Sequence, residues 1–522
     1  MAYLRQYSNH GLTWLIFRLL AFDVNSFWIQ LIYFGTVSLF GYLALSVSKP
    51  RDHDHHPSEL DLLFTSVSAT TVSSMSTVEM EVLSNIQLII MTILMLIGGE
   101  VFLSMLETQL RRFKLAKLNG TAHHMTTTFP NSGPSHFNDQ IIELPTDSPP
   151  PPPQSENKNL ESSIENQIKF VVVDNVLRYN SIKFLGYVVL FYLLAVHIFG
   201  YTLVYMYIIL VPTAKQVLKT KAIKIPTFSI FTVVSTFTNC GFIPTNENMI
   251  VFKKNSGLLL ILIPQILLGN TMYPIFIRLW IWSLWKITKR MEFNYMLRNY
   301  GEMGYTHLLS ALHSYLLGVA ALMFMLVQII LFCSMEWNLE AMDGLSAYQK
   351  FIASLFQVAN SRHAGESVFD LSTISAAVLV LFVVMMYLPP YTHLCTKVDQ
   401  KQKSSENTRQ KLSIVDCISP LSYLTIFTIL ICITERPKLK KDPLNFNVLN
   451  IFFEVVSAYG NVGFSMGYSC KRQLHAESDC EDKWYGFSGK WTPQGKLVLI
   501  LVMFFGRLKR FTLQGGKAWK LS

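Results

Sequence analysis

Several long stretches without charge constrain this chain more than any other feature of its sequence. Residues 27–47 carry no charged side chain, and residues 184–214, 308–335 and 371–396 carry none apart from one histidine each. About 20 apolar residues in a helix are enough to cross the hydrocarbon core of a bilayer. These four stretches therefore predict membrane-spanning helices.

Four further stretches are apolar but shorter or interrupted. Residues 86–106 contain only one charge, Glu100, and residues 256–285 also contain one. Residues 417–434 are shorter, and residues 497–505 are too short to count alone. Seven spans with an inferred eighth predict an all-α polytopic membrane protein.

The composition agrees with a membrane protein. Charged residues make up 15% of the chain and hydrophobic residues 51%, whereas soluble proteins average about 25% charged residues. The formal net charge of +10 fits lysine and arginine that face the cytoplasm and anionic lipid. We therefore expect contact with membrane lipid and no nucleic-acid partner. The seven cysteines show no CxxC or zinc-binding spacing, so we expect no resident metal site and no cofactor.

Two polar segments separate the apolar ones. Residues 111–180 include a proline run at 149–153 and many Ser, Thr and Asn, which predicts a disordered or loosely ordered loop at least up to about residue 165. The predicted division of the chain is a cytoplasmic N-terminus at 1–26, repeat A at 27–110, a partly disordered cytoplasmic loop at 111–182, repeat B at 183–290, repeat C at 307–397, a cytoplasmic loop at 398–412, repeat D at 413–511 and a cytoplasmic C-terminus at 512–522.

The segments that follow the first, third, fifth and seventh spans resemble one another. They read FTSVSATTVSSM from Phe64, FTVVSTFTNCGF from Phe231, LFQVANSRHAGE from Leu355 and FEVVSAYGNVGF from Phe453. Aligned without gaps, they place four residues in one column, namely Ser74, Gly241, Gly365 and Gly463. Seven positions before this column every copy has valine, and the next position is small in all four. We interpret the chain as four copies of one span–loop–span unit.

Each copy has a physical interpretation as a re-entrant pore element. About ten semi-apolar residues are too few to span, so each should enter the membrane as a short helix and return as extended chain. Four such returns around one axis would form a ring of carbonyl oxygens, which is how cation filters are built. Glycine at the turn adopts positive φ without strain. The alternative is that these glycines only allow close helix packing, but four copies, each between two spans, favour a cation pore.

The motifs in these loops are similar to those of the Trk/Ktr/HKT cation transporters, and several are specifically like plant HKT proteins. The resemblance covers nearly the whole chain except residues 115–165. It is carried by VSSMSTVEME at 72–81, NCGFIPTNENM at 239–249, NSRHAGE at 360–366, MMYLPPYT at 385–392 and SAYGNVGFSMGYSC at 457–470.

This resemblance implies that Ser74, Gly241, Gly365 and Gly463 occupy the selectivity-determining positions. In the family, members with glycine at all four positions tend to transport potassium as well as sodium. Members with serine in the first repeat tend to be sodium-selective, and plant subfamily 1 has this serine. This chain, with Ser74, therefore resembles subfamily 1. It also implies a homodimer with one pore per subunit, in the plasma membrane. Independently of the family, a Cβ and a hydroxyl at one corner would narrow the ring and favour sodium, which needs fewer carbonyl ligands.

Three residues are candidates for the pore below the ring. Arg507 should lie about 18 Å below the outer end of the last span, where an ionisable residue is functional by default. The alternative is an interfacial anchor beside neighbouring basic residues. Glu100 is expected either at the inner entrance or snorkelling at the interface. Asn270, with Gly269, breaks its helix and would supply a constriction, or else a kink that serves only packing.

Three acidic residues, Glu366, Glu247 and Asp370, are candidates for attracting monovalent cations at the outer mouth. Cys470 and Cys480 share the last outer loop, and their pairing is left open. The sequence thus predicts passive, channel-like sodium transport with both termini cytoplasmic. Sodium–potassium or potassium uptake through the same pore is the alternative. An enzyme is disfavoured, because no nucleophile, base or nucleotide-binding motif converges at one depth.

Overall fold

The computed structural model describes residues 26–51, 57–112, 155–388, 420–473, 480, 482–483 and 486–512. Within these ranges the regular structure is helical, apart from one isolated bridge between Tyr468 and Lys483. The expected N-terminal segment before residue 26, most of the loop at 111–182 before residue 155, the loop at 398–412 and the C-terminus after residue 512 lie outside the described residues.

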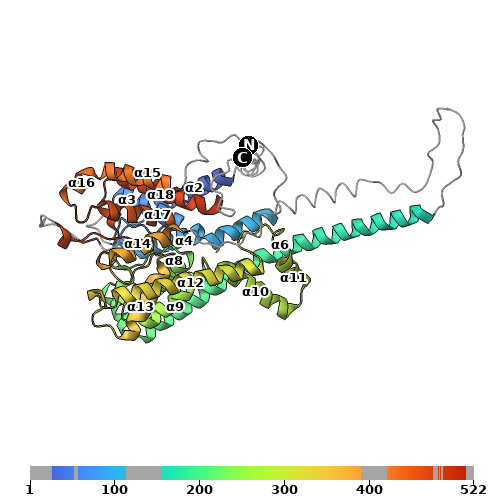
Figure 1. Cartoon of the computed structure of the whole chain (residues 1–522), viewed down its shortest axis with the longest axis horizontal. Coiled ribbons are helices and arrows are strands. Elements are labelled where there is room, and N and C mark those ends of the chain that lie inside the picture. Colours follow the sequence, from blue (N-terminus) through green and yellow to red (C-terminus); the bar gives the residue numbers. More distant parts are fainter. Residues whose placement is uncertain are drawn as a thin grey trace, which may run out of the picture. The chain divides into compact units, whose positions relative to one another are not determined.

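The helices follow the order span, short helix, span in each repeat (Figure 1). Repeat A contains α2 (Ser26–Val47), α3 (Glu59–Thr71), α4 (Asn85–Gly98) and the helix Glu100–Arg112. Repeat B contains α6 (Ser155–Leu210), α7 (Pro212–Thr220), α8 (Ile225–Thr238), α9 (Ser256–Leu268) and α10 (Tyr273–Thr288), followed by α11 (Met291–Arg298). Repeat C contains α12 (Ala311–Glu336), α13 (Ala347–Asn360) and α14 (Ala376–Tyr387). Repeat D contains α15 (Pro420–Thr434), α16 (Arg436–Lys441), α17 (Val448–Gly460) and α18 (Pro493–Thr512).

Short 3₁₀ helices lie in the connections between the longer helices. They are η1 (Met80–Val82), η2 (Asn248–Phe252), η3 (Glu340–Met342), η4 (Leu371–Thr373), η7 (Cys470–Arg472) and η8 (Phe487–Lys490).

The chain forms two compact units. The first comprises residues 1–103, 193–276 and 311–522, and the second comprises 104–192 and 277–310. The first unit contains α3, α8, α13 and α17, which we call the pore helices. In the second unit, the hydroxyls of Ser104 and Tyr305 lie 3.0 Å apart, and Arg278 donates a hydrogen bond to the Leu309 carbonyl at 2.7 Å.

The pore helices are arranged cyclically within the first unit. In each repeat the apolar helix that follows the pore helix, which we call the second helix, packs against the pore helix of the next repeat: α4 on α8, α9 on α13, α14 on α17, and α18 on α3. The last of these contacts closes the circle, since it joins repeat D to repeat A. The four predicted repeats therefore surround one axis, as the sequence pattern indicated.

Buried polar side chains accompany the apolar core of this unit, and large apolar side chains are exposed on its outer helices. In α3, Ser66, Ser68 and Thr70 are all 0% exposed, and the hydroxyl of Thr70 donates back to the Ser66 carbonyl. On α12, by contrast, Leu322 and Ile330 are 55% and 59% exposed. Large apolar side chains on an outer helix face lipid rather than water. The chain is a multi-pass, all-α membrane protein.

Long apolar helices are fewer in the structure than the predicted spans. Among the described residues, three helices are long and apolar enough to cross a membrane, or up to five if each bent pair is one span. In the predicted span 371–396, helix α14 covers Ala376–Tyr387, residues 371–373 form η4, and residues 389–396 lie outside the described residues. Conversely, α18 extends beyond residues 497–505 to Thr512.

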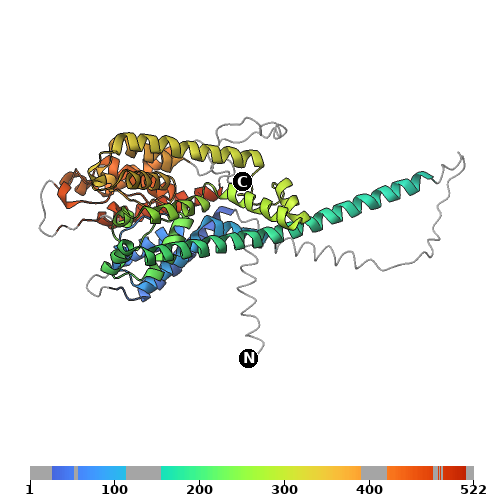
Figure 2. The same ribbon diagram turned by 90° about the horizontal axis from the view of Figure 1, so that it is seen from below.

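Helix α6 begins earlier than expected and is continuous in both views (Figures 1 and 2). The sequence predicted a loosely ordered loop up to about residue 165, but the helix starts at Ser155. Its first turns, SENKNLESSIENQ, follow the proline run and contain three Glu, one Leu, one Lys and one Gln, which have high helix propensity. The start predicted for repeat B, residue 183, consequently lies inside this helix.

Candidate selectivity filter

The four column residues share an unusual backbone conformation. Ser74 has a φ of 53°, Gly241 of 85°, Gly365 of 70° and Gly463 of 97°. Positive φ is rare outside glycine. That all four positions adopt it, in segments far apart in the sequence, indicates one structural element repeated four times. We call these residues the filter ring.

The spaces beside the glycines show how the ring closes. A Cβ built on Gly241 would lie 1.6 Å from the Ala364 carbonyl oxygen, in repeat C. A Cβ on Gly365 would lie 2.2 Å from the Val462 carbonyl oxygen, in repeat D. Each of these two glycines therefore abuts the carbonyl that precedes the filter position of the next repeat, and no side chain fits there.

Ser74 completes the ring between repeats D and B. A Cβ on Gly463 would lie 2.1 Å from the Ser74 Cβ, and one on Gly241 would lie 3.2 Å from the Ser74 hydroxyl oxygen. Ser74 is itself 6% exposed. The serine side chain of the filter ring thus occupies the space between two of its glycines. Its positive φ costs roughly 1–2 kcal/mol relative to glycine.

The turns before three of the filter positions are alike. In repeats A, B and D the residue two places before the ring (Val72, Asn239 or Asn461) is left-handed. The next amide donates to a carbonyl five residues back, as in Cys240 to Ser235 at 2.9 Å, which is the usual end of a helix with a left-handed cap. These three pore helices end three residues before the ring, whereas α13 ends at Asn360, five residues before Gly365.

Glycines of the second helices lie directly under the pore helices. A Cβ on Gly98 would lie 2.0 Å from the Thr70 carbonyl oxygen, and one on Gly269 would lie 1.7 Å from that of Phe237. Gly506 is placed in the same way, 2.1 Å from the Tyr459 carbonyl oxygen. All three carbonyls belong to residues four places before the filter position. The residues that follow these glycines therefore lie at corresponding places below the ring.

Two of the pore candidates occur at these places. Arg507 follows Gly506, is 1% exposed and donates a hydrogen bond to the Gly98 carbonyl. Its guanidinium carbon lies 5.6 Å from the centre of the Phe34 ring. This buried position differs from that of an interfacial anchor, whose charged end would reach lipid head groups.

Asn270 follows Gly269, is 3% exposed and lies in the break between α9 and α10, which are bent by 83°. Glu100 begins the helix after Gly99, where the chain bends by 56°. It is partly exposed and borders, with Gly99, Thr238 and Gly269, a gap too small to hold a water molecule. Both residues therefore lie at helix breaks in the first unit, on neighbouring repeats.

The three acidic candidates all contact other groups of the protein. Glu366 is 0% exposed and accepts a hydrogen bond from the Thr236 hydroxyl, in repeat B. Asp370 accepts a hydrogen bond from the Ser372 amide at 2.9 Å and caps η4. Glu247 pairs with Lys221 at 2.6 Å. All three carboxylates contact protein groups, and Glu366 keeps one buried oxygen, Oε2, without a hydrogen-bond partner among the described residues.

Lys221 lies in no motif that sequence reasoning singled out. It also pairs with Glu81, at 2.5 Å, and so ties the outer loops of repeats A and B together. Burial lowers the pKa of Lys221, but the two carboxylates outweigh it, so that the pKa is raised and the ammonium stays charged. Its partners are 140 and 26 residues away in the sequence, and no local pattern predicts a pair at such separations.

Cys470 and Cys480 form a disulfide, with Cα atoms 5.9 Å apart. The pairing that the sequence left open is therefore present. Among the described residues no group of three or more His, Cys, Asp or Glu could hold a metal ion.

Comparison with known proteins decides the family. Residues 174–392 and 414–514 match the TrkH family, described as "Cation transport protein". The chain is 48% identical over 487 residues to the sodium transporter HKT1 of Arabidopsis thaliana, with 92% of each chain covered. It is also 48% identical to the cation transporter HKT1;3 of Oryza sativa subsp. japonica, with 95% of this chain and 92% of the relative covered.

The chain belongs to the HKT cation transporters. As a member of the Trk/Ktr/HKT superfamily it transports cations across a membrane and is not an enzyme. The solved structure of the potassium transporter TrkH from Vibrio parahaemolyticus is 14% identical, with a TM-score of 0.48, and the match covers 94% of this chain and 85% of that one.

Proposed function

We propose that this HKT protein carries sodium selectively and passively through the filter ring. The observation that carries the proposal is the closed ring of four positive-φ residues in which serine stands at one position and glycine at the other three. The relative named a sodium transporter, at 48% identity, supports the same ion.

The chemistry follows from the ends of the pore helices. The C-terminal end of a helix carries partial negative charge, and all four pore helices end next to the ring. Backbone carbonyls at the ring would replace part of the ion's hydration shell. The Cβ and hydroxyl of Ser74 occupy space beside Gly463 and Gly241, which would leave a smaller set of ligands. Sodium tolerates such a set, with water, better than potassium does.

Arg507 and Asn270 would act below the ring. A fixed guanidinium under a cation filter repels each ion that passes, so Arg507 would slow conduction. Asn270, at the break between α9 and α10, would form part of a constriction. Sodium–potassium transport through the same ring is the second candidate, since other HKT relatives are named only as cation transporters.

The setting of this function is part of the proposal. The protein would work in the plasma membrane with both termini cytoplasmic, as a homodimer with one pore per subunit, surrounded by lipid. It would need no cofactor and no metal other than the transported ion. Glu247, Glu366 and Asp370 would shape the outer loops through their protein contacts more than attract cations from solution.

Uptake of radioactive sodium by liposomes that contain the purified protein tests the proposal. With a sodium gradient and no nucleotide, we expect uptake that an equal concentration of potassium barely inhibits. Empty liposomes are the control. Uptake that requires ATP would exclude a passive pore, and uptake that potassium inhibits as strongly as unlabelled sodium does would favour the second candidate.

A further inference from the structure

The filter position of repeat C is held differently from the other three. In repeats A, B and D the residue two places before the ring is left-handed and closes the turn through the backbone. In repeat C this place belongs to His363, which is not left-handed, and the residue after α13, Ser361, is right-handed helical. The Gly365 amide still donates to the Asn360 carbonyl oxygen, at 3.2 Å, so the backbone closes this turn at the ring itself. No left-handed residue fixes the place of His363, two residues earlier.

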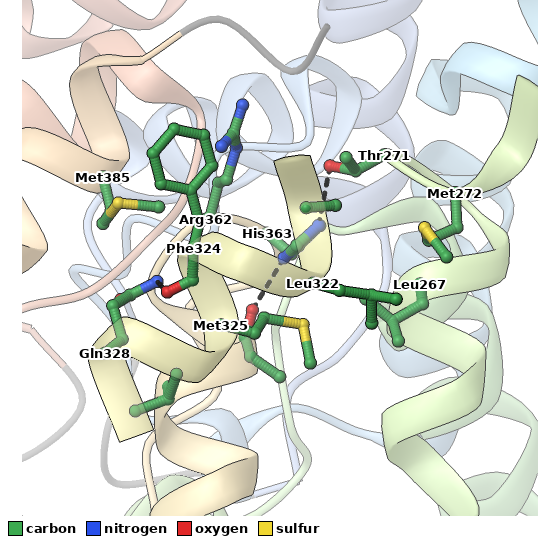
Figure 3. A pocket seen from close by; sticks show the side chains of 13 residues that line it. Leu267, Thr271, Met272, Leu322, Phe324, Met325, Gln328, Arg362, His363 and Met385 are labelled. Carbon is green, nitrogen blue, oxygen red and sulfur yellow. Dashed lines mark hydrogen bonds between the residues drawn. The ribbon is translucent and has the colours of Figure 1, made fainter. Parts of the chain in front are cut away.

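The side chain of His363 supplies two hydrogen bonds at this point (Figure 3). Its Nδ1 lies 2.7 Å from the Ala359 carbonyl oxygen of α13, and its Nε2 lies 2.8 Å from the Thr271 hydroxyl oxygen. Because a carbonyl only accepts, the bonding assigns the proton to Nδ1. Nε2 then accepts from the Thr271 hydroxyl. The imidazole is 3% exposed, so its orientation is set by these contacts.

Thr271 belongs to repeat B, whereas His363 belongs to repeat C. It is 1% exposed and follows Asn270 in the break between α9 and α10. The hydrogen bond therefore connects the break of repeat B with the filter turn of repeat C, residues 92 positions apart. It lies at the packing contact of α9 with α13.

Little water is available to replace this bond. The cavity beside it has a volume of about 10 Å³, enough for a single water molecule. Its lining includes the apolar side chains of Met272, Leu322 and Met385. Arg362 also lines it, with its guanidinium carbon 5.2 Å from the centre of the Phe324 ring. Without the Thr271 hydroxyl, the Nε2 of His363 would therefore lose its hydrogen-bond partner, and water would not take its place.

We propose that Thr271 and His363 are positioning residues for ion selectivity. Their hydrogen bond makes the helix break of repeat B and the third position of the filter ring move together, so that a change at the break reaches the filter. This inference rests on the proposed function, because it assigns a role in the selectivity of that same ring.

The test uses four single variants of the full chain in oocytes, with the surface amount measured for each. Thr271→Val removes the hydroxyl at nearly equal volume, and Thr271→Ser retains it. In His363→Asn the side-chain amide can replace Nδ1 and bind the Ala359 carbonyl, but it is too short to reach Thr271. In His363→Gln the longer side-chain amide can replace Nε2 and bind Thr271. The readout is the potassium-to-sodium permeability ratio from reversal potentials, which does not depend on how much protein is present.

We expect Thr271→Val and His363→Asn to raise this ratio by about threefold to tenfold, as the loss of one hydrogen bond would allow. Thr271→Ser should remain close to the wild type. His363→Gln loses the bond to Ala359 but can keep the one to Thr271, so its ratio should lie closer to the wild type than that of His363→Asn. The double variant Thr271→Val/His363→Asn should be no more affected than either single one, because both remove the same bond.

A wild-type ratio in Thr271→Val, effects that multiply in the double variant, or equal ratios for His363→Asn and His363→Gln would overturn the proposal. If Thr271→Val does not reach the surface, the His363 pair decides alone. A wild-type protein whose reversal potential ignores sodium would instead contradict the proposed function, whatever the variants do.

Discussion

At the scale of single residues, a strained backbone position and a buried charge occur in the filter ring and among the residues below it. Ser74 stands at positive φ, where serine is less stable than glycine. Arg507 carries a charge at a site where it is 1% exposed. A positive φ at serine and a buried charge both lower the stability of the folded protein. Such features persist mostly where function needs them.

Arg507→Gln should increase sodium current. At an effective dielectric constant near 20, two unit charges about 10 Å apart repel by roughly 1.7 kcal/mol, so removing the charge should speed passage by on the order of tenfold. Sodium current per surface protein measures this, with Arg507→Lys as the control that keeps the charge. An unchanged current in Arg507→Gln would mean that the guanidinium only supports the Gly98 carbonyl to which it donates.

At the scale of elements, three of the second helices approach the backbone of a pore helix at a glycine. Gly98, Gly269 and Gly506 each face a carbonyl oxygen at the end of their own pore helix. Such approaches require glycine, because any Cβ would overlap with the oxygen. The register of each of these second helices against its pore helix is therefore fixed at one residue.

Gly269→Ala should destabilise the folded protein by about 1–3 kcal/mol or more, since its Cβ would lie 1.7 Å from the Phe237 carbonyl oxygen. We expect a lower melting temperature in detergent and less protein at the surface. Gly35→Ala is the matched control, because nothing lies within 4 Å of its added Cβ. Equal melting temperatures for the two variants would show that the break can move aside.

The repeated elements can be predicted from the sequence, and their irregularities cannot. The pore elements can be identified by constant spacing, because each copy has a valine seven positions before its filter-ring residue. These valines are at positions 67, 234, 358 and 456. The hydrogen bond of His363 with Thr271 and the ion pairs of Lys221 join residues far apart in the chain. No period or local motif encodes such contacts, because they depend on how separate repeats meet.

At the scale of the whole molecule, one covalent bond adds to the cyclic packing. The disulfide between Cys470 and Cys480 closes a short loop in repeat D. By loop-closure entropy a loop of this length contributes about 2–3 kcal/mol.

Cys470→Ser should therefore lower the melting temperature of the purified protein and leave its ion preference unchanged, because the cysteine lies outside the filter ring. Cys432→Ser, at a cysteine without a disulfide, is the control. A changed permeability ratio in Cys470→Ser would show instead that this loop takes part in selectivity.

The central claim is that Ser74 makes the filter ring prefer sodium. Reversal potentials of the expressed protein in mixed sodium and potassium solutions, repeated with Ser74→Gly, test it most directly. We predict that the wild-type reversal potential follows sodium alone, and that Ser74→Gly also responds to potassium. A wild-type reversal potential that already follows potassium would contradict the claim, and so would a Ser74→Gly protein that still ignores it.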